Sequence, residues 1–256
     1  MSSVGVVPEL ILLRHGQSEW NAKNLFTGWE DVNLTDQGQQ EATHAGLLLE
    51  QAGVDVRVLH TSLLTRAIRT ATLALDAMGR PWVPAQRDWR LNERHYGDLQ
   101  GKNKKETTEQ YGAEQVKIWR RSYTTPPPPL GEGDSRRANG DTRYRDIDPA
   151  LLPASECLAD VVARTLPYYN DVIIPDLRHT ARSGGAVLVV AHGNSLRALR
   201  KELDGISDDD IVGLEIPTGI PFRYLLNDNG SVIESGYLGD ADLAAKAAAE
   251  VANQAG

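Results

Sequence analysis

Two histidines, His15 and His192, each stand between an apolar run and a glycine. His15 belongs to residues 10–16, which read LILLRHG, and His192 belongs to residues 186–193, which read AVLVVAHG. An imidazole can act as a nucleophile or a base, and a glycine lets a ligand approach the backbone closely. A single such histidine is more often structural than catalytic. The repeated pattern therefore favours a site over two strands that merely end in polar turns.

The charged residues around these histidines favour an anion site over a metal site. Four histidines could offer nitrogen ligands, but the chain has no His-Glu-x-x-His motif and no carboxylate triad to accompany them. The neighbouring charged residues are arginines, whose guanidinium groups pair with phosphate or carboxylate oxygens. We therefore expect an anion site without a metal. The histidines are His15, His60, His95 and His192, and the arginines are Arg14, Arg66, Arg94, Arg120 and Arg121.

Two arginine positions carry further information. Arg66 falls in the first turn of an expected helix, where backbone N–H groups also attract an anion. Arg120 and Arg121 alone would be a solvated surface pair. Because they stand just before the proline run 126–129, a functional role is equally open.

This combination favours phosphoryl transfer through a phosphohistidine. The nucleophile would be a neutral nitrogen of His15, with the other nitrogen hydrogen-bonded to hold the tautomer. Arg14, Arg66 and a protonated His192 would neutralise the charge on the transferring group. The leaving oxygen needs a proton, and Glu93 is the candidate donor. A surface salt bridge is the alternative role for Glu93.

The hydrophobic pattern predicts the elements that would position these residues. Residues 10–13 and 186–191 predict strands buried on both faces, and residues 56–60 predict a third. Ligands bind at the carboxyl ends of parallel strands in open α/β sheets, so we expect the two imidazoles to face each other. Helices are expected from an N-cap at Thr35 to a stop at Gly53, from the hydroxyl-rich residues 61–65 to about Met78, over 104–119, from 155 to about 169, and after Ser195.

The connecting segments are read from proline, glycine and polar residues. Residues 126–129 are all proline, and the polar stretch 130–149 behind them is either disordered or, as we favour, a functional lid. We also expect an edge strand at 82–84, a loop at 91–101, a surface loop at 179–185, a hairpin of strands 222–226 and 231–233 around the turn 227–230, and an alanine-rich helical tail from Asp240.

Composition excludes several classes of function. The 256 residues show no clear linker, which favours one domain over two. The net charge of -8 argues against a nucleic-acid or anionic-membrane binder. A single cysteine, Cys157, excludes an internal disulfide and a multi-cysteine zinc site. The N-terminus has no signal-peptide pattern, and no apolar run approaches the roughly 20 residues of a membrane span. A cytoplasmic protein is expected.

Seven motifs, in order between about Glu9 and Leu238, make the chain resemble the cofactor-dependent phosphoglycerate mutases of the histidine phosphatase superfamily. The motif Arg-His-Gly alone would identify only the superfamily. The motifs at 91–97 and 120–123 are more specific to mutases. The motifs are LLRHGQSEWN (12–21), FTGW (26–29), LTDQG (34–38), TSLLTRA (61–67), LNERHYG (91–97), RRSY (120–123) and AHGNSLR (191–197).

The resemblance implies a fold and an activity. The fold would be α/β, a three-layer α/β/α sandwich with a mostly parallel central sheet. It would be one domain over 1–256, with a long lid loop and with terminal tails at 1–8 and about 240–256. The enzyme would interconvert 2- and 3-phosphoglycerate in glycolysis and gluconeogenesis, primed by 2,3-bisphosphoglycerate and without a metal. It would take a small anionic phosphorylated substrate, bind no nucleic acid or membrane, and form a dimer or tetramer. The alternatives are a histidine phosphatase on small phosphorylated metabolites and a non-catalytic phosphate-binding module.

The resemblance also implies a role for each matching residue. His15 would be phosphorylated, and Glu93 would donate and accept the proton. Arg14, Arg66, His192, Asn21 and the backbone of Gly193 would bind the transferring phosphoryl group. The substrate carboxylate end would contact Thr27, Gly28, Arg94, Tyr96 and Lys104, and the non-transferring phosphate or carboxylate would lie against Arg120, Arg121 and Asn194.

The chain departs from the family pattern in a few places. Gln17 stands where the family commonly has glutamate, and Asn92 where it often has threonine. Residues 179–185 resemble an insert. The tail after Gly239 matches the family least.

Overall fold

The two apolar segments that precede the histidines are neighbouring parallel strands at the centre of the sheet. In the computed structural model, which describes residues 7–240, 242 and 245–249, β1 (Glu9–Arg14) pairs with β4 (Ala186–Ala191). Arg14 stands opposite Ala191, and the His15 amide donates to the Ala191 carbonyl oxygen at 3.0 Å. His15 and His192 therefore leave the sheet at the same edge, as predicted.

The sheet has six strands in the order β3-β2-β4-β1-β5-β6. The strands β2 (Val56–Thr61) and β3 (Ala85–Arg87) extend the parallel part beyond β4. The predicted hairpin is confirmed as β5 (Phe222–Leu226) and β6 (Val232–Tyr237), an antiparallel pair joined to the other side of β1. The sheet is thus mostly parallel, as expected.

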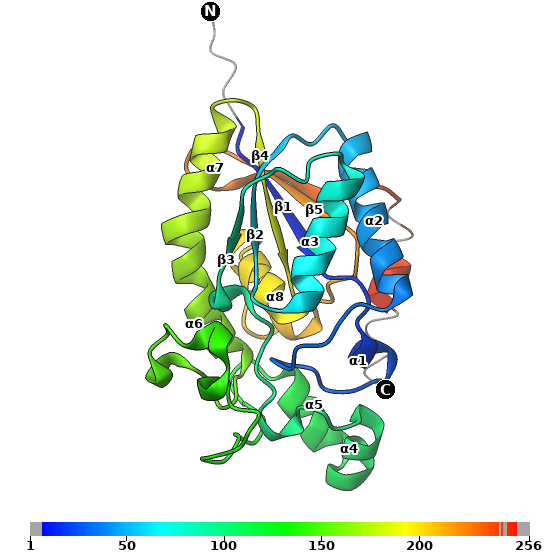
Figure 1. Cartoon of the computed structure of the whole chain (residues 1–256), viewed down its shortest axis with the longest axis vertical. Helices are drawn as coiled ribbons and strands as arrows, with labels where there is room; N and C mark the ends of the chain where they lie inside the picture. Colours follow the sequence, from blue (N-terminus) through cyan, green and yellow to red (C-terminus); the bar gives the residue numbers. More distant parts are fainter. Residues whose placement is uncertain (1–6, 241, 243–244, 250–256) are drawn as a thin grey trace, which may run out of the picture.

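Helices cover both faces of this sheet (Figure 1). Alternate residues of β1 point to opposite faces. Ile11 and Leu13 pack toward α2 (Asp36–Gln51) and α3 (Thr65–Ala77). Leu10 and Leu12 pack against the layer of α6 (Leu158–Tyr168), α7 (Ile174–Ala181) and α8 (Gly193–Leu203). The three-layer α/β/α sandwich is confirmed.

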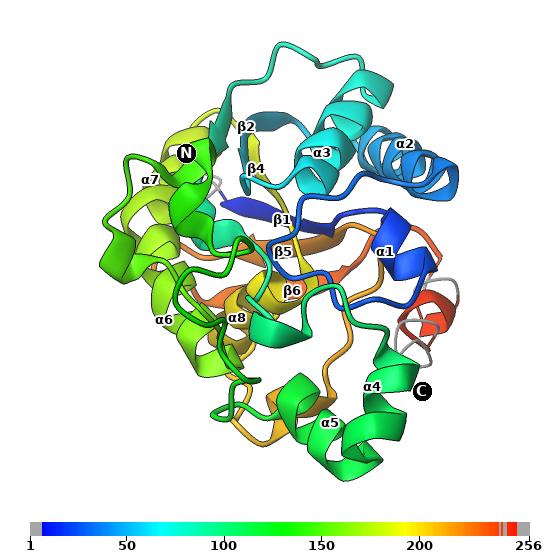
Figure 2. The same ribbon diagram turned by 60° about the horizontal axis from the view of Figure 1, so that its bottom comes forward.

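Three further helices lie beyond the carboxyl ends of the parallel strands (Figures 1 and 2). They are α1 (Glu19–Ala22), α4 (Lys104–Tyr111) and α5 (Ala113–Arg121). The prediction of one helix over 104–119 is wrong, because Gly112 adopts a φ of 83° and separates α4 from α5. Short helical turns complete the chain at Trp89–Leu91, Gly97–Leu99, Ala138–Gly140, Thr142–Tyr144, Pro149–Leu151, Tyr169–Ile173 and Asp210–Gly213.

Three other local predictions need correction. The edge strand is Ala85–Arg87, just after Pro84, rather than 82–84. Helix α3 is capped at Leu64 without a side-chain bond, and Asp31 accepts the Thr65 amide hydrogen bond at 2.7 Å. The first residues of 179–185 are the end of α7, where Thr180 and Ala181 are buried, so only the remainder forms a surface turn. The caps at Thr35 and Gly53 are confirmed.

The segment 126–152 is folded rather than disordered. Ala138, Tyr144 and Leu152 are buried and pack around Trp29, whose ring stacks on Tyr144. Tyr144 Oη also accepts from Asn92 Nδ2 at 2.9 Å, so the segment supports the loop that carries Glu93. In the part of the chain that the structure describes, the residues that line the central pocket come from other segments.

Residue 242 and residues 245–249 of the tail are helical. The rest of the expected tail helix, and most of the expected N-terminal tail, lie outside the described residues. Among the described helices, none is long and apolar enough to span a bilayer.

Candidate active site

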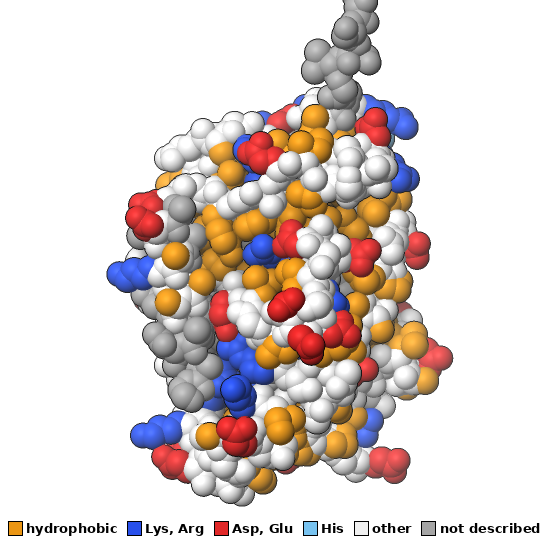
Figure 3. Space-filling model, turned by 180° about the vertical axis from the view of Figure 1, so that it is seen from behind, with side chains coloured by type: hydrophobic (Ala, Val, Ile, Leu, Met, Phe, Trp, Pro, Cys, Tyr) orange, Lys and Arg blue, Asp and Glu red, His pale blue; other side chains and the backbone are white. Residues whose placement is uncertain are grey.

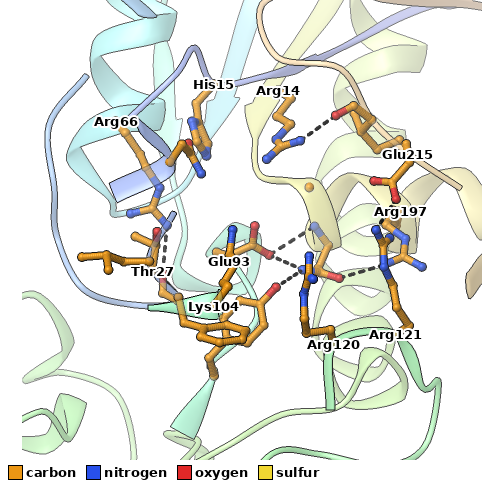
Figure 4. A pocket seen from close by; sticks show the side chains of 18 residues that line it. Arg14, His15, Thr27, Arg66, Glu93, Lys104, Arg120, Arg121, Arg197 and Glu215 are labelled. Carbon is orange, nitrogen blue, oxygen red and sulfur yellow. Dashed lines mark hydrogen bonds and ion pairs between the residues drawn. The ribbon is translucent and has the colours of Figure 1, made fainter. Parts of the chain in front are cut away.

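A pocket opens where β1 and β4 end, between α1, α5 and α8 (Figure 4). All of the residues that the sequence predicted for the site line it, except His192 and Arg94. Its volume is about 790 Å³, part of it open to solvent. The residues around it are Arg14, His15, Asn21, Leu25, Phe26, Thr27, Gly28, Arg66, Glu93, Tyr96, Lys104, Arg120, Arg121, Gly193, Asn194, Arg197, Glu215 and Ile216.

His15 is buried and has one nitrogen engaged. Its Nδ1 donates to the carbonyl oxygen of Gly16 at 2.7 Å, which leaves Nε2 as the nitrogen with a lone pair. Burial, and then the charges of Arg66 and Arg14, hold the pKa of His15 well below its usual value. The ring is therefore neutral at pH 7 and suited to nucleophilic attack.

The turn after His15 requires glycine. A Cβ on Gly16 would collide with the carbonyl oxygen of Gly38 in the first turn of α2. The amide of Gly16 donates to Thr70 Oγ1 at 3.1 Å. The amide of Gln17, which belongs to the same peptide as the Gly16 carbonyl, donates to Glu41 Oε2 at 2.8 Å. These contacts fix the carbonyl oxygen that sets the His15 tautomer.

Arg14 and Arg66 are both held by backbone carbonyl oxygens. Arg14 Nη1 donates to Ile216 O at 2.7 Å, and its buried Nε has no partner among the described residues. Arg66 is 1% exposed and donates to Gly28 O at 2.8 Å and to Glu30 O at 3.0 Å. Burial lowers the pKa of Arg66 to about 10, which still leaves it charged at pH 7. Both cations are thus fixed beside His15 before any ligand arrives.

His192 lies behind His15 rather than on the pocket wall. The two rings meet edge to face, with centroids 5.0 Å apart, and His192 Nε2 lies 2.8 Å from Ser62 Oγ. Burial, followed by Arg66, holds the pKa of His192 well below its usual value. Burial and the neighbouring charges therefore favour the neutral form of His192, and its protonation beside a transferring phosphoryl group stays a prediction.

Glu93 is buried, so its alternative role in a surface salt bridge is wrong. It is 8% exposed, and its Oε1 accepts three hydrogen bonds. The donors are the amide of Arg94 at 2.8 Å, the amide of Asn194 at 3.1 Å and Asn194 Nδ2 at 2.8 Å. A Cβ built on Gly193 would stand 3.7 Å from Glu93 Oε2 and 3.6 Å from Arg14 Cζ. The bare backbone of Gly193 therefore lies between the cation and the carboxylate.

A second group of cations lies across the pocket from His15 (Figure 4). It consists of Lys104, Arg120, Arg121 and Arg197. Burial, and then the charges of Arg120, Arg14 and Arg121, lower the pKa of Lys104 to about 8. Arg121 forms an ion pair with Glu215, and Arg197 Nη1 donates to Asn194 Oδ1 at 3.2 Å.

Paired loops position the residues on the α1 side of the pocket. Phe26 N donates to Lys102 O at 3.0 Å, and Gly101 N donates to Phe26 O at 2.9 Å. This pairing brings Thr27 and Gly28 close to Lys104 at the start of α4. Gly28 has a φ of 56°, which favours glycine, and a Cβ there would collide with the Gln100 side chain.

Asn21 presents its amide nitrogen from α1. Its Oδ1 accepts from the Ser18 amide at 3.1 Å and from Ser18 Oγ at 2.8 Å. These bonds fix the amide, so that Nδ2 is the group available to an anion.

Arg94 is one predicted ligand that does not reach the pocket. It is 1% exposed, stacks on Tyr96 at 4.5 Å and donates to the carbonyl oxygen of Arg120 at 2.8 Å. It thus supports the wall from behind. Sequence reasoning missed Arg197 and Glu215. Arg197 could have been found, because it lies three residues after Asn194 on one helix face. Glu215 lies in an irregular loop without a signal.

The lining is cationic although the chain is acidic. Arg14, Arg66, Lys104, Arg120, Arg121 and Arg197 outnumber Glu93 and Glu215. Figure 3 shows Lys and Arg side chains gathered in a hollow in the lower part of the molecule, where Figure 1 places α4 and α5. In the described part of the chain, no group of three or more His, Cys, Asp or Glu residues could hold a metal ion. The arrangement can bind an anionic group at each end and transfer a phosphoryl group at one of them.

Comparisons with known proteins agree with this chemistry. Residues 10–140 match the model of the histidine phosphatase superfamily (branch 1). A 2,3-bisphosphoglycerate-dependent phosphoglycerate mutase of Streptomyces avermitilis is 58% identical over 248 residues, which cover 96% of each chain. A phosphoglycerate mutase of Candida albicans is 56% identical, covering 97% of this chain and 98% of the relative.

Solved structures share the fold at lower identity. The structure titled mycobacterial hydrolase 1 has a TM-score of 0.69 at 21% identity, covering 92% of this chain and all of that one (100%). A mycobacterial glucosyl-3-phosphoglycerate phosphatase has a TM-score of 0.67 at 22% identity, covering 90% of this chain and 97% of the other.

Proposed function

The chain belongs to the histidine phosphatase superfamily and, within it, to the 2,3-bisphosphoglycerate-dependent phosphoglycerate mutases, and on that premise we propose that it interconverts 2- and 3-phosphoglycerate through a phosphorylated His15. One observation carries the proposal. His15 is neutral and presents Nε2 to a pocket that Arg14, Arg66 and the Glu93 carboxylate also line (Figure 4). These are the groups that an intramolecular phosphotransferase needs, and such an enzyme is an isomerase of glycolysis and gluconeogenesis.

His15 and its neighbours carry out the transfer. Nε2 attacks phosphorus while the Nδ1 hydrogen bond to Gly16 O holds the tautomer and stabilises the positive charge that develops on the ring. Arg14, Arg66, Asn21 and the Gly193 amide bind the equatorial oxygens, whose charge must be neutralised during transfer. His192 stands behind His15. A phosphoryl dianion beside His192 favours the protonated form, which then donates a hydrogen bond.

Glu93 moves the proton. With Oε1 fixed by three donors, Oε2 gives a proton to the leaving sugar-acid oxygen and removes one from the attacking hydroxyl. The two reactions are the reverse of each other. One carboxyl group in a fixed place therefore suffices for both.

The second cationic group holds the rest of the substrate. Arg120, Arg121 and Asn194 bind the non-transferring phosphate or carboxylate, while Thr27, Gly28, Tyr96 and Lys104 bind the carboxylate end. A bisphosphoglycerate supplies the phosphoryl group that primes His15. The two cationic groups in one pocket fit its two phosphates. The cations of the chain provide the charge neutralisation for which other phosphotransferases use a metal ion.

A histidine phosphatase would use the same residues with water as the second acceptor. The mutase reading accounts for the second cationic group, which must retain the intermediate while it reorients. We also propose, from the resemblance, that the protein is cytoplasmic and forms a homodimer or homotetramer. Light scattering tests the oligomeric state.

The deciding assay follows 3-phosphoglycerate isomerisation with and without 2,3-bisphosphoglycerate, while inorganic phosphate is measured. Isomerisation that depends on the primer, with little phosphate released, supports the mutase. Stoichiometric phosphate release without isomerisation would instead make the protein a phosphatase.

A further inference from the structure

The peptide group that joins Glu93 to Arg94 is held at both of its polar ends. Its carbonyl oxygen accepts from Trp29 Nε1 at 2.6 Å and from Arg164 Nη2 at 3.0 Å. Its N–H donates to Glu93 Oε1 at 2.8 Å. We propose that Trp29 and Arg164 are positioning residues for proton transfer. By binding the Glu93 carbonyl oxygen, they aim the next N–H at the Glu93 carboxylate.

Arg164 is anchored independently of the pocket. Its ion pair with Glu156 has a length of 2.6 Å, and the two side chains are 8% and 4% exposed. The same guanidinium donates to the carbonyl oxygens of Arg90 at 2.7 Å and Asn92 at 3.1 Å. Arg164 therefore binds the backbone just before Glu93 as well as the carbonyl oxygen of Glu93.

Glu156 binds the backbone on the other side of Glu93 in the sequence. Its Oε2 accepts from the His95 amide at 2.8 Å and from Arg164 Nη2 at 3.0 Å. One buried ion pair thus holds the loop from residue 90 to residue 95.

Trp29 is fixed by a second set of contacts. Its ring stacks on Tyr144 with a centroid distance of 5.0 Å, and its amide donates to Gln100 Oε1 at 2.7 Å. Tyr144 in turn accepts from Asn92 Nδ2 at 2.9 Å. The segment expected to act as a lid therefore contributes, through Tyr144, to the placement of Glu93.

The physical consequence concerns the carboxylate rather than substrate binding. Two donors on a carbonyl oxygen polarise the peptide, so its N–H becomes a stronger donor. A donor to a carboxylate favours the charged form and narrows its orientation. Neither Trp29 nor Arg164 lines the pocket, so removing one of these donors should leave the substrate contacts in place.

The test compares two tryptophans of one aromatic cluster. Trp29→Phe removes the N–H donor and keeps an aromatic ring against Tyr144. Trp89→Phe makes the same truncation 6.1 Å away, at a ring whose nitrogen bonds to no residue that the structure describes. We expect Trp29→Phe to lower kcat about tenfold with KM within about twofold, since part of the general acid–base contribution depends on orientation. The acidic limb of its pH profile should move to higher pH. Trp89→Phe should change neither.

Arg164→Lys is the second variant, because lysine can keep the pair with Glu156 but cannot reach three carbonyl oxygens at once. It should show the same loss of kcat and the same pH shift. A purely structural role would lower the melting temperature of both variants and the folded fraction, with kcat per folded molecule and the pH profile unchanged. That result would overturn the proposal.

The proposal rests on Glu93 as the proton-transferring group. The variant Glu93→Gln distinguishes a failure of that role from a failure of the positioning role of Trp29 and Arg164. If Glu93→Gln keeps full activity, the proposed role of Glu93 fails. If Glu93→Gln is inactive while Trp29→Phe and Arg164→Lys keep normal kcat and pH profiles, only the positioning role fails.

Discussion

The Nδ1 nitrogen of His15 donates a hydrogen bond of 2.7 Å to the carbonyl oxygen of Gly16. This single contact decides which ring nitrogen can attack. The carbonyl is held in place because the N–H of the same peptide, that of Gln17, donates to Glu41 Oε2 at 2.8 Å, and the Gly16 amide donates to Thr70 Oγ1 at 3.1 Å. The tautomer is therefore fixed by the backbone.

The first prediction concerns this nucleophile. His15→Ala should abolish isomerisation and also the acid-labile phosphate label on the protein, since the imidazole nitrogen that accepts the phosphoryl group is removed. The measurements are the coupled isomerisation assay and labelling with a radioactive phosphoryl donor. Persistence of either signal in a folded variant would refute the assignment.

The second prediction concerns His192. Its loss should slow the phosphorylation of His15 without preventing it. His192→Ala should still take up phosphate at His15 but at least about tenfold more slowly, because one donor to the transferring group is lost. Rapid-quench labelling measures this rate. An unchanged rate would remove His192 from the site.

Gly193 should tolerate a methyl group structurally but not functionally. The added Cβ would make only ordinary contacts at 3.6 to 3.7 Å with Arg14 and Glu93, so Gly193→Ala should fold with a melting temperature near that of the wild type. The methyl group occupies space between the cation and the carboxylate, and kcat/KM should fall about 10- to 100-fold. Gly213→Ala, where a Cβ meets nothing within 4 Å, is the matched control. Equal activity of the two variants would contradict the placement of the phosphoryl group.

Lys104 should give substrate capture a pH dependence. Burial and neighbouring arginines lower its pKa to about 8, so the free enzyme carries the charge below that pH and loses it above. The value of kcat/KM for an anionic substrate should therefore fall as the pH rises through about 8. In Lys104→Arg, whose charge persists, this basic limb should disappear. If it stays, another group titrates there.

Chelation should not affect the reaction. Arginine side chains neutralise the charge of the transferring phosphoryl group, so dialysis against EDTA should leave kcat unchanged. Inactivation that added magnesium or zinc reverses would disprove the metal-free mechanism.

The sequence by itself determined the strands and the chemistry of their ends. A short, fully apolar run such as 186–191, bounded by glycine and polar residues, favours a buried strand in a sheet covered on both faces. The residues that follow such parallel strands lie at one edge of the sheet. Local signals also sufficed for Thr35 as an N-cap, Gly53 as a helix stop and the hairpin at 227–230, because each depends on neighbours in the chain.

Only the tertiary structure decided the state and support of the site. The neutrality of His192 depends on burial beside Arg66, which is distant in the sequence. The sequence predicts Arg94 as a cation of the pocket, but in the structure its guanidinium stacks on the ring of Tyr96. Trp29 and Arg164 donate hydrogen bonds to the Glu93 carbonyl oxygen although they lie 64 and 71 positions away from Glu93 in the chain. Local patterns carry no information on such contacts, because they arise when distant segments pack together and exclude water.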